Sequence, residues 1–380
     1  MNIMGYIFRE YPDRLIIIST MLLMMIGIVF VYSVSGPYVQ FLNESQPTWY
    51  FLYRQSLWTI IALIILFFVY RLDYEIIVKF SPLLMIFALV ALLAVLIISK
   101  ADIKRWINIG PISFQPSEFF KLAAVAFLAR IAARKVANFD GYRKLFPTIA
   151  LVLLGIMLVI KEPDLGTSSL IFGIMVALLF LSGFPSKYIM AMGAAALVVF
   201  SLLVFVMGYE KDRVDQYLIT VKDPFNSAAS YQTRQALVSF GSGGLLGKGL
   251  GNGGQKHLFL PARHTDFILA SAAEEGGFAI VAAILSLFAV VGLSGYRIAT
   301  AAADIQGAML AWGMLLSILI QATLNIGVAL GLFPITGVTL PFISYGGSSL
   351  VMSCMSIGIL ASVARRSRSP RKYFRRFRGE

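Results

Sequence analysis

The residue best placed for catalysis carries a carboxylate at the start of an apolar segment. Asp266 follows Arg263, His264 and Thr265 and directly precedes a long apolar stretch. A carboxylate in that position can act as a general base that takes the proton of a hydroxyl group. Thr265 or Asp266 can also be the N-cap of the following helix and accept a hydrogen bond from its free amides. Both interpretations stay open, and Asp266 is the candidate catalytic residue.

Two further carboxylates lie inside the same apolar stretch. If the segment is helical, Glu274 and Glu275 lie about 12 Å deeper than Asp266, at 1.5 Å per residue. A carboxylate within a membrane span is costly, so such residues are functional candidates and usually pair with a base. We therefore count Glu274 among the candidate substrate-binding residues, together with His264 and Thr265.

A second polar set marks the start of another apolar segment. Its candidate substrate-binding residues are Arg105, Gln115, Ser117, Glu118 and Lys121. Pro116 suits the first turn of a helix, on which Glu118 and Lys121 are close enough to meet on one face. Such a pair either holds helices together or forms a charged wall of a polar cavity, and the sequence favours neither.

Three more features add polar candidates. The segment 241–254 has eight glycines in fourteen residues. Its bare amides can approach an anion or a sugar closely, with Lys248 adding charge, although a flexible linker is the alternative. Arg54, at the start of another apolar segment, is a further candidate cation. Asp164, in the turn 161–167, is expected to cap the next helix.

Composition indicates a membrane protein. Of the 380 residues, 58% are hydrophobic and 13% are charged, whereas soluble domains have about 45–50% and about 25%. The apolar residues form blocks of roughly 18–25, long enough to cross about 30 Å of hydrocarbon. We predict an all-α polytopic membrane protein with ten transmembrane helices. The expected spans are 15–34, 51–70, 79–99, 117–133, 146–160, 166–183, 187–208, 267–295, 306–331 and 341–364.

The distribution of charge predicts the orientation. The loops 35–50 and 332–340 contain no Lys or Arg, whereas the loops on the other side are basic. By the positive-inside rule, both termini are cytoplasmic, and the segments 100–116 and 209–266 share the extracytoplasmic face. The connection 209–266 is then a large extracytoplasmic loop between helices 7 and 8, and its aromatic and glycine content suggests that it is ordered.

A basic tail follows the apolar blocks. One membrane-embedded domain is expected over 1–364, and eight of the 32 basic residues lie in the tail 365–380. Such a tail beside a membrane span sets orientation and contacts anionic lipid, so nucleic-acid binding is not expected. The single cysteine excludes an intramolecular disulfide, and the two histidines have no neighbouring cysteines for a structural zinc site.

Long runs of the sequence resemble one known family. They are VYSVSG at 31–36, RWINIGPISFQPSEFFKL at 105–122, EPDLGTS at 162–168, YQTRQALVSFGSGGLLGKGLGNGGQK at 231–256, LPARHTDFILASAAEEGG at 260–277 and NIGVALGLFPITGVTLPFISYGGSSL at 325–350. The chain is similar in these runs to the SEDS family (shape, elongation, division and sporulation), the glycan polymerases typified by FtsW and RodA. GLGNGGQK and LPFISYGGSSL are closer to the FtsW-like division branch than to the RodA-like elongation branch.

The resemblance implies a peptidoglycan glycosyltransferase that polymerises lipid II at the outer face of the bacterial cytoplasmic membrane, for cell division or cell-shape maintenance. It also implies that Asp266 is the catalytic carboxylate. We expect an inverting transfer with undecaprenyl diphosphate as leaving group, stabilised by a cation among Arg54, Arg105, Lys121 and Lys248. Expected partners are lipid II, membrane lipids, a class B penicillin-binding protein (a transpeptidase) and other division or elongation proteins.

Two alternatives fit part of the pattern. Charges at membrane depth also suit a transporter that flips lipid II, although no internal repeat is visible and the polar residues gather toward one face. A non-catalytic scaffold for division proteins is the other alternative. The sequence requires no cofactor and no metal ligands are predicted; a divalent cation, Mg²⁺ or Mn²⁺, is compatible with the reaction, but no ligand cluster demands one.

Overall fold

The computed structural model describes residues 11–42, 47–98, 105–109, 112–135, 145–223, 225–226, 229–254 and 260–368. Most of these residues are helical. The helices are α2 (Pro12–Leu42), α3 (Tyr50–Arg71), α4 (Tyr74–Ile98), α5 (Pro116–Lys135), α6 (Phe146–Lys161), α7 (Leu165–Leu181), α8 (Ser186–Ser201), the π-helical turn η2 (Leu202–Val206), α9 (Lys211–Lys222), α10 (Tyr231–Gly243), α11 (Ile268–Thr300), α12 (Ile305–Ala329) and α13 (Gly347–Arg368). Between α4 and α5, strands β1 (Ile107–Ile109) and β2 (Ile112–Phe114) form an antiparallel hairpin.

Seven of the described helices are long and apolar enough to cross a membrane: α2, α3, α4, α8 with η2, α11, α12 and α13. Each of the other three predicted spans also contains a helix, but α5 has 20 residues with charges among them, and α6 and α7 have only 16 and 17. A helix of 16 residues covers about 24 Å, less than the hydrocarbon thickness of about 30 Å. The polytopic helical class is confirmed, whereas the count of ten crossings stays a prediction.

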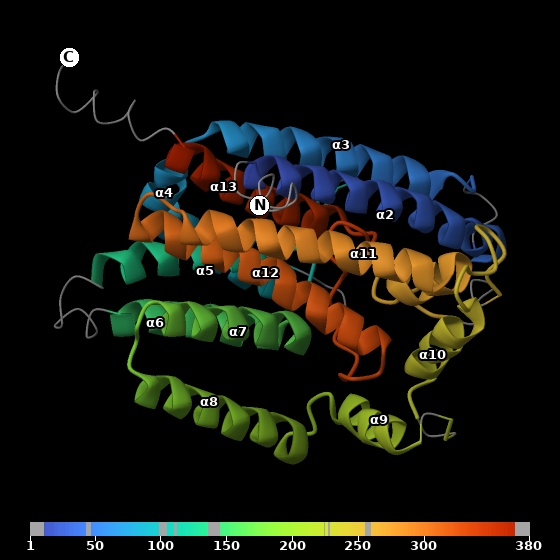
Figure 1. The fold of residues 1–380 in the computed structure, drawn as a ribbon. Coiled ribbons are helices and arrows are strands. Elements are labelled where there is room, and N and C mark those ends of the chain that lie inside the picture. The colour runs from blue at the N-terminus through green and yellow to red at the C-terminus, as the bar shows by residue number, and fades with distance from the viewer. Residues whose placement is uncertain are drawn as a thin grey trace.

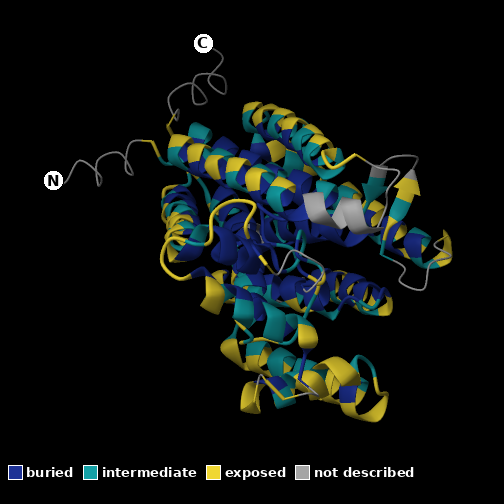
Figure 2. Ribbon diagram, turned by 90° about the vertical axis from the view of Figure 1, so that its right-hand side faces the viewer, coloured by how far each residue is buried: buried dark blue, intermediate teal, exposed yellow. Residues whose placement is uncertain are grey.

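Helix α13 forms the centre of the bundle. In its apolar window 89% of the residues are buried, and it packs against α2, α3, α5, α11 and α12. Figure 1 shows α2 and α3 on one side of the bundle, with α6 and α7 on the other. Helix α8 lies at the edge, where only 6% of its window is buried. Buried residues therefore gather in the middle of the bundle (Figure 2).

The observed helices differ from the predicted spans at several ends, and two of these differences have a clear structural cause. Helix α13 begins at Gly347 rather than at residue 341, because residues 341–345 form a turn in which Phe342 has a φ of 68°. Helix α11 runs to Thr300, beyond the predicted end at residue 295, and it is broken at Gly277, which has φ 66° and ψ −166°. Glycine is needed at this break because a side chain would lie 2.3 Å from the main-chain nitrogen of Gly247.

The connection between α8 and α11 is ordered over its described residues, as its composition suggested. It contains the helices α9 and α10, followed by the glycine-rich segment and the turns that precede α11. Helix α10 packs on α11 and α12. Its Ala236 joins Leu260, Phe267, Ala270 and residues 328–329 of α12 in a small buried cluster. This cluster fixes the chain next to Asp266.

The first and last described helices meet at one end of the bundle. Arg368 at the end of α13 pairs with Asp13 of α2 at 2.7 Å, and Arg366 pairs with Asp73 between α3 and α4 at 3.0 Å. The described start and end of the chain therefore share one side of the bundle, while their cytoplasmic location stays a prediction. Most of the predicted basic tail, residues 369–380, lies outside the described residues.

Candidate active site

Arg105 is held against the turn that joins α6 to α7. It lies just before β1, and its Nε donates a hydrogen bond to the main-chain oxygen of Glu162 at 3.2 Å. The same Nε is 3.9 Å from Oδ2 of Asp164, and the Arg105 side chain is only 15% exposed. One edge of the guanidinium is therefore anchored by a carbonyl and a carboxylate, while Nη1 lies beside Gly337 in the segment between α12 and α13.

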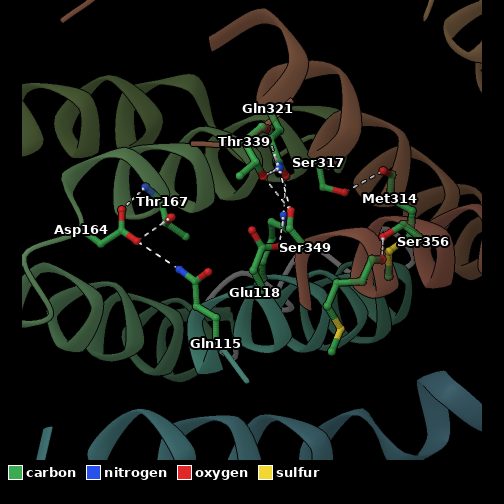
Figure 3. A network of polar contacts seen from close by, with 12 residues as sticks. Gln115, Glu118, Asp164, Thr167, Met314, Ser317, Gln321, Thr339, Ser349 and Ser356 are labelled. Atoms are coloured by element: carbon green, nitrogen blue, oxygen red, sulfur yellow. Dashed lines mark hydrogen bonds and ion pairs between the residues drawn. The ribbon is translucent and has the colours of Figure 1, made fainter. Parts of the chain in front are cut away.

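Asp164 caps α7 and helps to anchor Arg105. Its carboxylate accepts hydrogen bonds from the amide of Thr167 at 3.0 Å, from the Thr167 hydroxyl at 2.9 Å and from the Gln115 side-chain amide at 3.4 Å (Figure 3). The predicted helix cap is confirmed. Burial raises the pKa of Asp164, while Arg105 and the bonds from Thr167 oppose the rise.

The segment before α11 is held by its main-chain carbonyls. The oxygens of residues 264–266 accept hydrogen bonds, in that order, from Tyr345 (2.8 Å), Ser344 (2.6 Å) and Asn325 (2.9 Å). Phe267 follows directly and is fully buried in the cluster between α10, α11 and α12. The backbone that carries the Asp266 side chain is thus fixed from both sides.

The Asp266 carboxylate does not cap α11. The N-cap of α11 is Phe267, and no side chain makes the capping hydrogen bond. The Thr265 hydroxyl instead donates to the carbonyl of Ala262 at 3.1 Å. The interpretation of Thr265 or Asp266 as the helix cap is therefore wrong, because the clamped carbonyls hold the chain in a turn until residue 267.

Burial and neighbouring charges shift the pKa of the Asp266 carboxylate. Burial raises its pKa to about 6; Arg105 opposes the rise, Asp164 adds to it, and Arg213 at the start of α9 opposes it. A carboxylate with this pKa is mostly ionised at pH 7 yet more basic than an ordinary aspartate. These are the properties that a general base for a hydroxyl group needs.

We predict that Asn325 positions Asp266. The Asn325 amide donates to the main-chain oxygens of Asp266 at 2.9 Å and Val338 at 2.7 Å, so it ties the two segments of the site together. Asn325→Leu removes both hydrogen bonds while keeping the branched shape of the side chain. It should lower kcat by up to about 10²-fold through misplacement of the carboxylate, with a smaller change in KM.

Kinetics and thermal unfolding together test this prediction. The control is Ser317→Ala on the same helix, which removes a buried hydrogen bond to the carbonyl of Met314 and nothing next to Asp266. Asn325→Leu should lose activity at temperatures where it is fully folded, whereas Ser317→Ala should keep it. An Asn325→Leu variant that melts earlier but turns over normally would reduce Asn325 to a purely structural role.

Glu118 and Lys121 form a buried ion pair within a larger network. The Lys121 ammonium lies 2.7 Å from the Glu118 carboxylate and 2.6 Å from the side-chain oxygen of Gln321 on α12. The Gln321 amide in turn reaches the carbonyl of Thr339 at 3.1 Å and the hydroxyl of Ser349 at 3.3 Å (Figure 3). The predicted meeting of the two charges is confirmed, and the network joins α5, α12 and α13. A role of the pair in binding substrate stays a prediction.

We expect Lys121→Met to lower the free energy of unfolding by about 3–5 kcal/mol, because it leaves Glu118 buried without its partner charge. The double variant Glu118→Gln/Lys121→Met should recover most of this loss. Thermal unfolding in detergent and a turnover assay measure both effects. Activity that returns together with stability confirms a structural pair, whereas a stable but inactive double variant contradicts it.

Arg54 and His264 belong to an aromatic cluster beside the Asp266 segment. Arg54 donates to the hydroxyl of Tyr50, one turn earlier on α3, at 2.8 Å. The His264 ring is 5.1 Å from the ring of Phe51 and 5.8 Å from that of Tyr345. Burial lowers the pKa of His264 to about 4, so the ring is neutral at pH 7. Substrate binding by Arg54, His264 and the neighbouring Thr265 stays a prediction.

The glycine-rich segment packs on α11 and binds it through its amides. The amides of Lys248 and Gly249 donate to the main-chain oxygens of Glu274 and Glu275, each at 3.0 Å. The Gly254 amide donates to the Glu274 carboxylate at 2.8 Å, and the Lys248 ammonium pairs with the same carboxylate at 2.7 Å. These three amides therefore serve the protein itself, and the interpretation of them as donors to an anion or a sugar is wrong.

The break in α11 explains this arrangement. In an unbroken helix, the oxygens of residues 274 and 275 accept from the amides four residues later. Here the amides of Phe278 and Ala279 donate to the oxygens of Gly244 and Leu245, at 2.9 and 3.1 Å. The glycine-rich segment thus replaces the missing helical partners.

Four residues at the site were not found by sequence reasoning: Glu162, Arg213, Asn325 and Gly337. Glu162 is fully buried, its carboxylate accepts no hydrogen bond from the described residues, and burial, with a contribution from Asp164, raises its pKa to about 8. Its place beside Pro163, in a short polar turn between two apolar segments, was the available signal. The predicted Ser117 is also fully buried, near the start of α5.

The fold and the site together define a polytopic α-helical protein with a partly buried carboxylate and an anchored guanidinium at one end of its bundle. Comparison with known proteins identifies the family. The family model for FtsW, RodA and SpoVE, described as cell cycle proteins, matches residues 13–369, and the chain belongs to this family.

Individual relatives cover almost the whole chain. The stage V sporulation protein E of Bacillus subtilis is 39% identical over 95% of this chain and 99% of its own length. A probable peptidoglycan glycosyltransferase FtsW of Geobacter metallireducens is 34% identical over 94% of this chain and 96% of its own. Among solved structures, a chain from a peptidoglycan synthase complex aligns with a TM-score of 0.72 and 25% identity, over 93% of this chain and 98% of its own. RodA of Thermus thermophilus aligns with a TM-score of 0.68 and 25% identity, over 92% and 96%.

Proposed function

We propose that the protein is a peptidoglycan glycosyltransferase that polymerises lipid II at the outer face of the bacterial cytoplasmic membrane. The observation that carries the proposal is the convergence of the Asp266 carboxylate and the Arg105 guanidinium at Gly337, both within 4 Å of one point. A base and a fixed cation at one place suit a transfer in which a hydroxyl loses its proton and a diphosphate departs. The FtsW relatives that carry this activity in their names support it.

In the proposed reaction, Asp266 takes the proton of the GlcNAc 4-hydroxyl as its oxygen attacks the anomeric carbon of the donor with inversion. Undecaprenyl diphosphate leaves next to positive charge. Arg105 is the favoured cation, because its Nη1 and the Asp266 carboxylate lie next to the same position at Gly337. Lys121 and Lys248 each pair with a carboxylate at 2.7 Å, closer than the 3.9 Å between Arg105 and Asp164, and Arg54 lies in the aromatic cluster. No residues are assigned to a divalent cation, since no group of three or more His, Cys, Asp or Glu side chains in the described ranges is arranged to hold one.

The proposal also includes a location in the membrane, an orientation and a partner protein. Seven apolar helices support a multi-pass membrane location, and we assign the Asp266 end of the bundle to the extracytoplasmic side, with both termini in the cytoplasm. A class B penicillin-binding protein is the proposed partner, supported by the likeness to a chain of a peptidoglycan synthase complex.

A polymerisation assay tests the proposal. The purified protein, alone and with a co-purified class B penicillin-binding protein, is incubated with lipid II, and the products are separated on a gel. We expect glycan ladders that depend on the protein. In liposomes that contain labelled lipid II, net translocation without polymer would instead support the flippase alternative.

A further inference from the structure

Glu162 is a buried carboxyl group in the turn that joins α6 to α7. Its side chain is fully buried. Within the described part of the chain, its two carboxylate oxygens accept no hydrogen bond and form no ion pair. An unpaired charge is costly to bury, so a carboxyl group in this position holds its proton. Burial accordingly raises the pKa of Glu162 to about 8.

Two charged groups act on Glu162 in opposite directions. Asp164, two residues later in the same turn, raises its pKa, and Arg105 lowers it. Arg105 is also bound to the main chain of this turn, because its Nε donates to the Glu162 carbonyl at 3.2 Å and lies 3.9 Å from Oδ2 of Asp164. The Glu162 carbonyl, the Asp164 carboxylate and any charge on the Glu162 side chain therefore act on the same guanidinium.

The other titratable groups at this end of the bundle do not change charge near pH 8. Lys161 is exposed, and Arg213 pairs with a carboxylate at the start of its own helix at 2.9 Å. The Tyr209 hydroxyl donates to a main-chain carbonyl of α6, and burial raises its pKa above the ordinary value of tyrosine. The pKa of Asp266 is about 6, so this group is already ionised. Glu162 is the group that titrates in this range.

We propose that Glu162 is a positioning residue that acts through its proton: the neutral side chain leaves Arg105 in place beside Gly337, and the ionised side chain draws the guanidinium away from the substrate. The inference rests on the proposed function and adds control by pH to the same site. An ionised Glu162 would be a second carboxylate, besides Asp164, that acts on Arg105. It would offset the positive charge that the departing diphosphate needs.

The alkaline side of the pH–rate profile tests this role. One pH unit above the pKa, only about one molecule in ten keeps the proton, so the wild-type rate of lipid II polymerisation should be about tenfold lower at about pH 9 than at about pH 7. Glu162→Gln has the shape of the protonated acid and cannot ionise. We expect this variant to polymerise at nearly the same rate at both pH values.

The matched control is Glu75→Gln on α4, the same chemical change on a side chain that is 52% exposed and pairs with Arg366. Its rate should decline with pH as the wild-type rate does. In Arg105→Ala the alkaline decline should be lost, because no guanidinium is left for Glu162 to attract. An alkaline decline that persists in Glu162→Gln or in Arg105→Ala would overturn the proposal.

Infrared difference spectroscopy tests the proton directly and needs no substrate. A protonated carboxyl group and a carboxylate absorb at different frequencies, so spectra of the purified protein at about pH 7 and about pH 9 report which groups lose a proton between them. We expect the wild type and Glu75→Gln to lose a protonated carboxyl band that Glu162→Gln lacks. A wild-type spectrum without this band would show that Glu162 is already ionised at neutral pH and would refute the proposal.

The failures of the two proposals are distinguishable. If the wild-type protein polymerises lipid II but Glu162→Gln shows the same alkaline decline, the positioning role is refuted while the activity stands. If the wild-type protein forms no polymer with its partner present, the proposed function itself fails, and the infrared band still reports whether Glu162 holds a proton.

Discussion

Replacing Asp266 with asparagine is expected to lower the rate of lipid II polymerisation by about 10²–10⁴-fold, the contribution that a positioned base typically makes. Asparagine keeps the size of the side chain and the main-chain bond to Asn325, so the fold and the binding of lipid II should be little changed. Initial rates of glycan formation, measured with the partner present, provide the test.

The matched control for this variant is Asp212→Asn on α9, an exposed carboxylate in the same connection between α8 and α11. It undergoes the same chemical change without removing the proposed base and should polymerise normally. A folded Asp266→Asn protein that makes wild-type glycan ladders would remove the general-base role from the mechanism.

The pH dependence of the wild-type rate follows from the same carboxylate. Burial raises the pKa of Asp266 to about 6, and a base works only when it is ionised. The rate should therefore be full above this pKa and decline as the pH falls through about 6, at a higher pH than for an ordinary aspartate. A rate that stays flat down to pH 5 would contradict this assignment.

Replacing Arg105 with alanine is expected to lower kcat by about 10²–10³-fold, because it removes the fixed positive charge from the place where the diphosphate departs. It has a second consequence. Arg105 opposes the rise in the pKa of Asp266, so its loss should move the acidic limb of the pH–rate profile to higher pH. Rate profiles of wild type and variant measure both effects.

The matched control is Arg234→Ala on α10, whose guanidinium lies 5.5 Å from the ring centroid of Tyr231. It should keep both the rate and the position of the acidic limb. Arg105→Lys should retain part of the rate, since lysine keeps the positive charge. It lacks the guanidinium, whose Nε lies near Asp164 while its Nη1 lies beside Gly337. If the acidic limb of the pH–rate profile does not shift in Arg105→Ala, the charge of Arg105 does not influence the ionisation of Asp266.

Local signals in the sequence were sufficient for much of the architecture. Helix α5 begins at Pro116 and α7 follows the Asp164 cap, as expected from residues that act on their immediate neighbours. The pairing of Glu118 with Lys121 also follows from their spacing on one helix. Such predictions succeed because each depends on contacts within one turn of chain.

Predictions that needed contacts between distant segments were the ones that failed or could not be made. The capping interpretation of Asp266 is wrong because segments near residues 325 and 345 hold the carbonyls before α11. The glycine-rich segment resembled a ligand-binding loop. The break at Gly277, however, leaves the carbonyls of Glu274 and Glu275 without helical partners, and amides of the glycine-rich segment donate hydrogen bonds to them. The segments that make these contacts cannot be identified from the spacing of residues along the chain.

The sequence by itself determined that this chain is helical and apolar, which polar residues gather at the ends of its segments, and which family it resembles. Only the tertiary structure decided that Arg105 and Asp266 both lie next to Gly337, with Arg105 held by Glu162 and Asp164. The physical reason is that helix periodicity and hydropathy are local properties, whereas a charged site is assembled by packing together elements that are distant along the chain.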